Sequence, residues 1–390
     1  MEFLFAGLVS AFVACVILAT KSYHLKYTAK GHSGAARQSA HRTPTPRIGG
    51  IAIFSGFIAG TAMTTPDVAA YALPLLLSCI AVFVGGLGED IGRDVRPKTR
   101  LILSFIFALC AIAIFRVWIG PLGSPYLNWI TSTLLGATVF TVLISGGMAH
   151  ATNWIDGLNG LAMGVCMLIA GGLAFLAHAV GDTVIVKISI MLMCSILGLF
   201  VFNFPYGKIF LGDAGAYTLG HVLICLSTLL VARNPEISPY AILMIFFWPI
   251  MDMLFAIFRW VAKREPIGAP DCLHFHQLMM RGLGLTYFDR TQRSVTNPFA
   301  TVLVLPLTVV PIIAAQFLWH DIGQSAVALL FFGALFIVTY RSLFVVILQR
   351  ASTRHQRRSA KAIPWSQIQV LRPRNNAFLG NQLAFRLVRI

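Results

Sequence analysis

Acidic residues are scarce in this chain, so the places where they occur carry information. The 390 residues include 14 Asp and Glu against 30 Lys and Arg. Several of the acids stand beside glycine, which lets a backbone approach a ligand closely. Hard divalent cations such as Mg²⁺ take oxygen ligands, commonly one or two carboxylates together with substrate phosphates. The placement of the acids therefore predicts a metal site that also receives phosphate.

The first group of candidates lies in residues 85–100. Glu89 and Asp90 stand side by side at the end of an apolar stretch, and four cations, Lys98 among them, follow. Carboxylates and cations in one short loop suit a metal and a phosphate together. The cations alone could equally be a topological anchor, whereas acids are not topology signals.

The second group is Asn153-Trp-Ile-Asp-Gly-Leu-Asn-Gly160. In a helix, Asn153, Asp156 and Asn159 would share one face at i, i+3 spacing. The segment that carries these amide and carboxylate oxygens is followed directly by an apolar stretch. The alternative is a helix cap in which Asp and Asn serve as turn residues.

The third group, residues 203–215, holds Asn203 and the sequence Gly-Asp-Ala-Gly around Asp213. Small neighbours leave Asp213 sterically open, although an aspartate that only caps a helix would have the same kind of neighbours.

Asp252 lies inside an apolar stretch, where a charge is costly in lipid, so we expect it to face the interior of the protein. A structural hydrogen bond and a functional role are both compatible with that position.

The fourth group is Asp271-Cys-Leu-His-Phe-His-Gln277. His274 and His276 cannot share a helix face, but both could reach one ligand from an extended segment. Zinc would need further Cys or His partners, and none accompanies them, so phosphate binding fits better. Surface histidines are the alternative.

The fifth group is His41-Arg-Thr-Pro-Thr-Pro-Arg-Ile-Gly-Gly50. Its prolines hold Arg42 and Arg47 at the mouth of an apolar stretch. Arginine suits bidentate recognition of phosphate, and a positive-inside anchor is again the alternative. All five groups need a scaffold that brings them to one place.

Composition predicts that this scaffold is a bundle of transmembrane helices. Hydrophobic residues make up 57% of the chain and charged residues 11%, whereas a soluble domain has roughly 25% charged residues. A spanning helix needs about 20 apolar residues. We expect an all-α fold with eleven spans, at 3–20, 48–64, 69–86, 101–119, 129–148, 158–180, 183–202, 214–232, 239–259, 299–319 and 323–346.

The loops predict the orientation of this bundle. One set of connections, counted with the tail and with the flanking Arg259 and Arg341, holds 27 of the 30 Lys and Arg residues, so that side should face the cytoplasm. With eleven spans the N-terminus lies outside and the C-terminus inside. The net charge of +16 then reflects loops beside anionic lipid or a polyanionic substrate, and we expect no nucleic acid. Residues 1–346 form the membrane domain, and 347–390 form a basic tail that lies on the membrane surface or is disordered.

Taken in order, the five groups resemble the polyprenyl-phosphate N-acetylhexosamine-1-phosphate transferase family. The segments PTPRIGG, ED…RPK, NWIDGLNGLA, NFPYGKIFLGDAGA, PIMD and HFHQL run from about residue 41 to residue 285. Each is weak alone, and together they are specific. The resemblance implies an enzyme of the bacterial inner membrane whose active site faces the cytoplasm. It would transfer an N-acetylhexosamine 1-phosphate from a UDP-sugar, by default UDP-GlcNAc, to undecaprenyl phosphate and release UMP. The product would initiate a cell-surface polysaccharide such as an O-antigen.

The resemblance also implies roles for individual residues and a Mg²⁺ or Mn²⁺ cofactor. Metal binding falls to Asp213, with Asp90. Catalytic roles fall to Glu89, Asp90, Asp156, His274 and His276. Substrate contacts fall to Arg42, Arg47, Lys98, Asn153 and Asn203.

Three residues depart from the family pattern, and two other functions compete. Glu89, Asn159 and Gln277 stand where well-known members have Asp, Asp and His. Because Glu is one methylene longer than Asp, the resemblance does not carry a strictly positioned role over to Glu89. The related phospho-N-acetylmuramoyl-pentapeptide translocase fits the PTPR and HFHQL segments less well. A secondary transporter would place polar residues near the membrane midplane, whereas here they stand at span ends. The sequence leaves the sugar, the glycan and a homodimer open.

Overall fold

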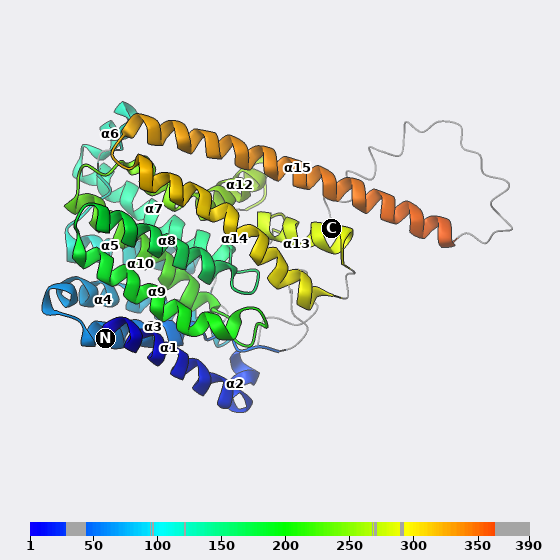
Figure 1. Cartoon of the computed structure of the whole chain (residues 1–390), viewed down its shortest axis with the longest axis horizontal. Helices are drawn as coiled ribbons and strands as arrows, with labels where there is room; N and C mark the ends of the chain where they lie inside the picture. The colour runs from blue at the N-terminus through cyan, green and yellow to red at the C-terminus, as the bar shows by residue number, and fades with distance from the viewer. Residues whose placement is uncertain are drawn as a thin grey trace.

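The computed structural model is a bundle of α-helices (Figure 1). It describes residues 1–28, 44–93, 95, 97–120, 122–266, 268, 271–288 and 292–362, with backbone alone at Pro97 and 354–362. In this part of the chain there is no β-strand. The helices are α1 (Glu2–Ala19), α2 (Lys21–Thr28), α3 (Gly50–Met63), α4 (Pro66–Asp90), α5 (Pro97–Phe115), α6 (Pro125–Thr131), α7 (Leu134–Trp154), α8 (Leu161–Ala179), α9 (Thr183–Asn203), α10 (Gly212–Arg233), α11 (Pro239–Ile245), α12 (Phe247–Lys263), α13 (Phe275–Thr286), α14 (Arg293–Leu318) and α15 (Ile322–Ala362).

The predicted membrane bundle is confirmed, and the count of eleven spans stays a prediction. Among the described residues, nine helices are long and apolar enough to cross a membrane, and a tenth candidate is the pair α11 and α12, bent by 82°. The predicted span at 239–259 is this bent pair. The predicted span at 48–64 is α3, whose 14 residues reach only about 21 Å, less than the roughly 30 Å of a bilayer core.

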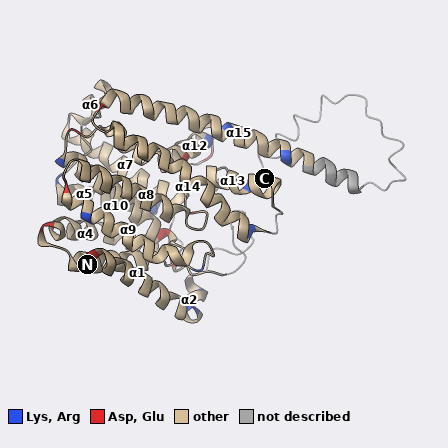
Figure 2. Ribbon diagram, viewed as in Figure 1, with Lys and Arg blue, Asp and Glu red and all other residues tan. Residues whose placement is uncertain are grey.

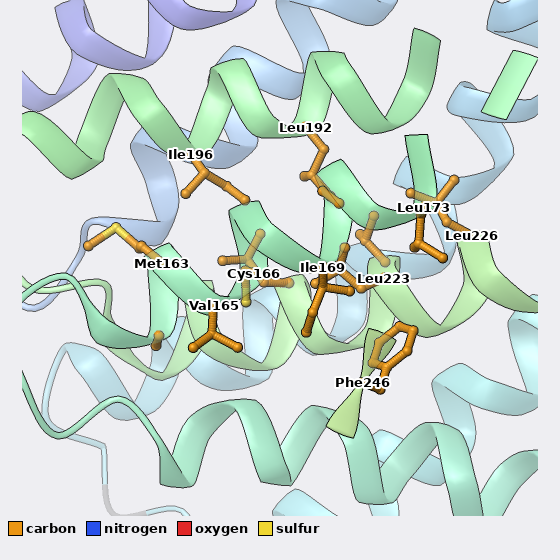
Figure 3. Close-up of a cluster of buried hydrophobic side chains, with 14 of the residues drawn as sticks. Met163, Val165, Cys166, Ile169, Leu173, Leu192, Ile196, Leu223, Leu226 and Phe246 are labelled. Atoms are coloured by element: carbon orange, nitrogen blue, oxygen red, sulfur yellow. The ribbon is translucent and has the colours of Figure 1, made fainter. Parts of the chain in front are cut away.

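Helix α10 lies at the centre of the bundle and contacts α3, α4, α7 and α8. Its apolar stretch is the most buried of the candidate spans. Figure 3 shows side chains of α8, α9 and α10 meeting in the core, with Ile169, Leu192 and Leu223 among them. Since α10 is enclosed on several sides, the residues at its N-terminus occupy a position fixed by several other helices.

Helix α15 is longer than a bilayer requires. Its 41 residues extend about 60 Å, and Figure 1 shows its C-terminal part continuing past the rest of the bundle. The helix runs without a break across position 346, where we placed the boundary between membrane domain and tail. Residues 363–390 lie outside the described part of the chain.

Charged residues are concentrated toward the helix ends, and the middle of the bundle is almost free of them (Figure 2). This distribution is expected for helices that cross hydrocarbon, where ionisable groups are costly. Large apolar side chains on the outside, such as Leu254 and Phe258, are exposed and would contact lipid tails. The orientation of the bundle relative to the cytoplasm stays a prediction.

Candidate active site

Asp90 holds the N-terminus of α10 against the C-terminus of α4. Its two carboxylate oxygens accept hydrogen bonds from the backbone N–H groups of Asp213 (2.8 Å) and Ala214 (2.9 Å). The first N–H groups of a helix have no partner within the helix, so Asp90 caps α10 from another helix. Asp90 itself is buried. This contact joins two of the predicted site residues and fixes the position of Asp213.

The segment that carries Arg47 runs alongside the segment that precedes α10. Backbone hydrogen bonds of 2.8–3.0 Å join residues 46–50 to residues 210–211. A guanidinium nitrogen of Arg47 thereby lies 3.8 Å from Oδ1 of Asp213. Gly212 has a φ of +77°, and a Cβ there would lie 1.8 Å from the carbonyl oxygen of Arg47, so only glycine fits this crossing.

Asn153 and Asp156, at the end of α7 and just beyond it, complete the surroundings of Asp213. Nδ2 of Asn153 donates a hydrogen bond to Oδ1 of Asp213 at 2.7 Å. Burial raises the pKa of Asp156 from 3.8 to about 7; the Arg47 cation opposes this shift and the Asp213 carboxylate adds to it. Both charges are therefore close to Asp156. Because α7 ends at Trp154 and residues 155–160 form turns, the helix face predicted for Asn153, Asp156 and Asn159 does not form; Asn153 and Asp156 instead share Asp213 as a neighbour.

Glu89 is paired with Arg100, a residue that we had counted only among the loop cations. A guanidinium nitrogen of Arg100 lies 2.9 Å from Oε1 of Glu89, and each side chain is about one quarter exposed (26% and 24%). His150, which the sequence reading missed, contacts Tyr217 edge-on at 5.1 Å between ring centres. His150 stands three residues before Asn153, so the same i, i+3 spacing could have identified it.

The two histidines lie against the connection between α7 and α8. The rings of His274 and His276 stack at 5.7 Å, and the ring of Trp154 lies 6.4 Å from that of His274. A Cβ on Gly157 would lie 2.4 Å from Nε2 of His276, so this glycine allows the close approach. His276 is buried, its ring nitrogens have no hydrogen-bond partner among the described residues, and burial lowers its pKa to about 4.

Asn203 and Asn159 brace the loops around the site. Oδ1 of Asn203 accepts from the backbone N–H of Gly160 at 2.5 Å, and its Nδ2 donates to the carbonyl of Ile209 at 2.6 Å. Nδ2 of Asn159 donates to the carbonyl of Pro205 at 2.7 Å. The buried Asn203 thus uses both ends of its amide within the protein. Its predicted contact with a substrate remains a prediction.

Of the two remaining predicted phosphate contacts, one lies away from this cluster and the other cannot be placed. Lys98 is exposed in the first turn of α5, and Arg42 lies outside the described residues. The structure therefore brings together candidates from four of the five segments around the N-terminus of α10, and it places the histidine segment beside the α7–α8 connection.

The acids of this cluster suit a cation that takes part of its ligands from a substrate. In the described part of the chain, no group of three or more His, Cys, Asp or Glu could hold a metal ion by itself. Magnesium usually needs only one or two carboxylates beside phosphate oxygens. Oδ2 of Asp213 and the carboxylate of Asp156 make no hydrogen bond to any described residue, so both are available. Asp90 uses each oxygen for one N–H group, although each keeps a second lone pair.

Comparison with known proteins identifies the chain. Residues 72–231 match the model of the family described as glycosyl transferase family 4. This stretch of the chain is similar to the members of that family. It is 29% identical over 253 residues to the probable undecaprenyl-phosphate N-acetylglucosaminyl 1-phosphate transferase of Bacillus subtilis, covering 65% of this chain and 70% of the relative. A decaprenyl-phosphate N-acetylglucosaminephosphotransferase of Mycobacterium leprae is 28% identical over 277 residues, covering 63% of this chain and 68% of its own length.

A third relative agrees with these two. The undecaprenyl-phosphate alpha-N-acetylglucosaminyl 1-phosphate transferase of Yersinia pestis is 26% identical over 248 residues, which cover 62% of this chain and 67% of the relative. The predicted family is therefore confirmed, and the protein is a glycosyl-1-phosphate transferase. The matched residues 72–231 include Asp90, Asp156 and Asp213, whereas the arginine and histidine segments lie beyond them.

Proposed function

We propose that this transferase moves N-acetylglucosamine 1-phosphate from UDP-GlcNAc to undecaprenyl phosphate and releases UMP. The observation that carries the proposal is the meeting of Arg47, Asn153, Asp156 and Asp213 at the N-terminus of α10. The relatives named above are transferases of N-acetylglucosamine phosphate to undecaprenyl or decaprenyl phosphate by their names. Their names favour this reaction over that of the peptidoglycan translocase.

The main obstacle to this reaction is the repulsion between two anionic substrates. The second pKa of a phosphate monoester is about 6, so much of the attacking lipid phosphate is already dianionic at neutral pH. Proton removal therefore contributes less than positioning and charge neutralisation, which dominate phosphoryl transfer. Arg47 supplies a positive charge beside Asp213.

Asp213 and Asp156 would hold the Mg²⁺ or Mn²⁺ ion that the family implies. When bound, such an ion neutralises phosphate charge during the transfer. Asn153 donates to one oxygen of Asp213 and so orients the carboxylate. Asp90 fixes the backbone of Asp213, which gives it a positioning role in addition to the metal role that the resemblance implies. Glu89, held by Arg100, is less suited to act as a free base.

The location of the reaction follows from the same proposal. The lipid substrate requires a bilayer, for which we propose the bacterial inner membrane, and the excess of Lys and Arg in one set of loops supports a site on its cytoplasmic face. A soluble nucleotide-sugar would meet a membrane-bound phosphate there. The product would initiate a cell-surface polysaccharide.

The test is release of UMP by the purified protein from UDP-GlcNAc, undecaprenyl phosphate and Mg²⁺. We expect release that depends on all three, and a loss on the order of 10²-fold or more in Asp213→Asn. Glu236→Gln, an exposed acid between α10 and α11, is the control and should keep full activity. Absence of release with any UDP-amino sugar, or full activity in Asp213→Asn, would refute the proposal.

A further inference from the structure

The buried carboxylate of Asp252 bonds directly to the histidine segment. Its Oδ2 lies 2.6 Å from Nδ1 of His274, and its Oδ1 accepts from the backbone N–H of Phe275 at 2.9 Å. Asp252 is 1% exposed and His274 is 5% exposed. A buried charge is costly unless it is paired and hydrogen-bonded, and this pair satisfies both oxygens of Asp252. The contact also fixes Nδ1 as a donor and leaves Nε2 as the free nitrogen of the ring.

The segment before His274 is held by α12, which also carries Asp252, and by α15. Arg259 of α12 donates to Asp271 through Nε at 2.9 Å and through a second nitrogen. The hydroxyl of Tyr340, on α15, donates to the carbonyl of Leu273 at 2.8 Å, and Arg259 donates to that hydroxyl at 3.1 Å. The backbone on either side of the histidine is therefore anchored by α12 and α15, both outside the residues that match the family model.

The charged groups around His274 favour its protonated form. Burial disfavours the imidazolium, but the Asp252 carboxylate outweighs it, and the pKa of His274 is raised above 6.5. Asp271 adds to this effect and Arg259 opposes it. The other titratable group in contact with the ring is the stacked His276. An imidazolium whose Nδ1 is occupied can still donate one hydrogen bond from Nε2.

We propose that Asp252 is a positioning residue that holds His274 as a cation, with its Nε2–H available to a substrate phosphate. The ring lies beside Trp154 and next to His276, which packs on Gly157. It therefore borders the end of α7, which carries Asn153, and the connection beyond it, which carries Asp156. A charge-assisted hydrogen bond to phosphate is roughly twice as strong as a neutral one. The inference rests on the proposed transferase reaction, because that reaction supplies the phosphate.

Asp252→Asn tests this role with little change in shape. The amide oxygen can still accept from Phe275, and the amide N–H can donate to Nδ1 of His274, so the segment stays anchored while the negative charge is lost. We expect kcat/KM to fall on the order of 10²-fold. The alkaline limb of its pH profile, which reports the loss of the His274 proton, should move about 1–3 pH units toward lower pH.

A double-mutant cycle and a matched control separate positioning from general stability. Because the aspartate acts through the histidine, Asp252→Asn in a His274→Gln background should change kcat/KM by no more than about twofold. Asp182→Asn removes another buried, ion-paired acid, at the opposite end of α10, and should leave the alkaline limb in place. The Tm of each variant in detergent is measured beside its kcat/KM, and only variants with the wild-type Tm are compared.

The outcomes distinguish this inference from the proposed function. If the wild-type protein releases no UMP, the proposed function is wrong and this role falls with it. If the wild type is active but Asp252→Asn keeps the wild-type alkaline limb, then Asp252 has only a structural role. The same conclusion follows if the fall in kcat/KM caused by Asp252→Asn adds fully to the fall caused by His274→Gln.

Discussion

Replacing Asp156 by asparagine should stabilise the folded protein above neutral pH while it abolishes transfer. The pKa of Asp156 is about 7 in the folded protein, against an ordinary value of 3.8. Folding therefore disfavours the ionised carboxylate. Each pH unit between two pKa values corresponds to about 1.4 kcal/mol, so full ionisation costs the fold on the order of 4 kcal/mol. An asparagine in the same place carries no such cost.

The sign of the pH dependence follows from the raised pKa. Below pH 3.8 the carboxyl is protonated in both the folded and the unfolded chain, so its ionisation does not change the free energy of unfolding. Between 3.8 and about 7 only the unfolded chain ionises, so wild-type stability falls as the pH rises, and the loss is complete above 7. We expect Asp156→Asn to exceed the wild type by several degrees in Tm at pH 8, and by progressively less toward pH 5.

Thermal unfolding of the purified protein in detergent, followed between pH 5 and pH 8.5, measures this difference. Added Mg²⁺ should raise the Tm of the wild type at pH 8 and have less effect on Asp156→Asn, because the cation would bind the ionised carboxylate. Glu236→Gln is the control for removing an acid and should follow the wild-type curve. Equal Tm values for Asp156→Asn and wild type throughout the range would refute the reasoning.

Two further predictions concern stability away from the charge cluster. Asn159→Asp replaces the amide that donates to the carbonyl of Pro205 with a group that cannot donate, so we expect a loss of about 1–3 kcal/mol and a lower Tm; an unchanged Tm would mean that this hydrogen bond is dispensable. Arg233→Gln removes the partner of the buried Asp182, which it contacts at 2.6 Å, and should cost about 1–2 kcal/mol at pH 7, because Arg233 is itself partly exposed. Burial raises the pKa of Asp182, but its bonds to Arg233 and to the backbone outweigh this and hold it below 3.8. The deficit of Arg233→Gln should therefore vanish as the pH falls through that lowered value, and a deficit that persists at that pH would contradict the assignment.

Much of the fold could be predicted because hydrophobicity is a local property. A run of apolar residues as long as a bilayer is thick forms a helix whatever its neighbours are. Nine of the predicted spans therefore correspond to single long helices. The division of 239–259 into α11 and α12 and the shortness of α3 could not be predicted in the same way, because hydropathy measures how apolar a stretch is and not where a helix within it begins, bends or ends.

For the site, the sequence by itself determined which residue types are available and on which connections they lie. It singled out Asp213 and Asp156 as candidates because acids are scarce in this chain, and Arg47 because prolines hold it at the mouth of an apolar stretch. Only the tertiary structure decided their partners. That Asp90 caps α10 and that Asp252 holds His274 could not be read from spacing, because each contact joins helix ends brought together by the packing of the whole bundle.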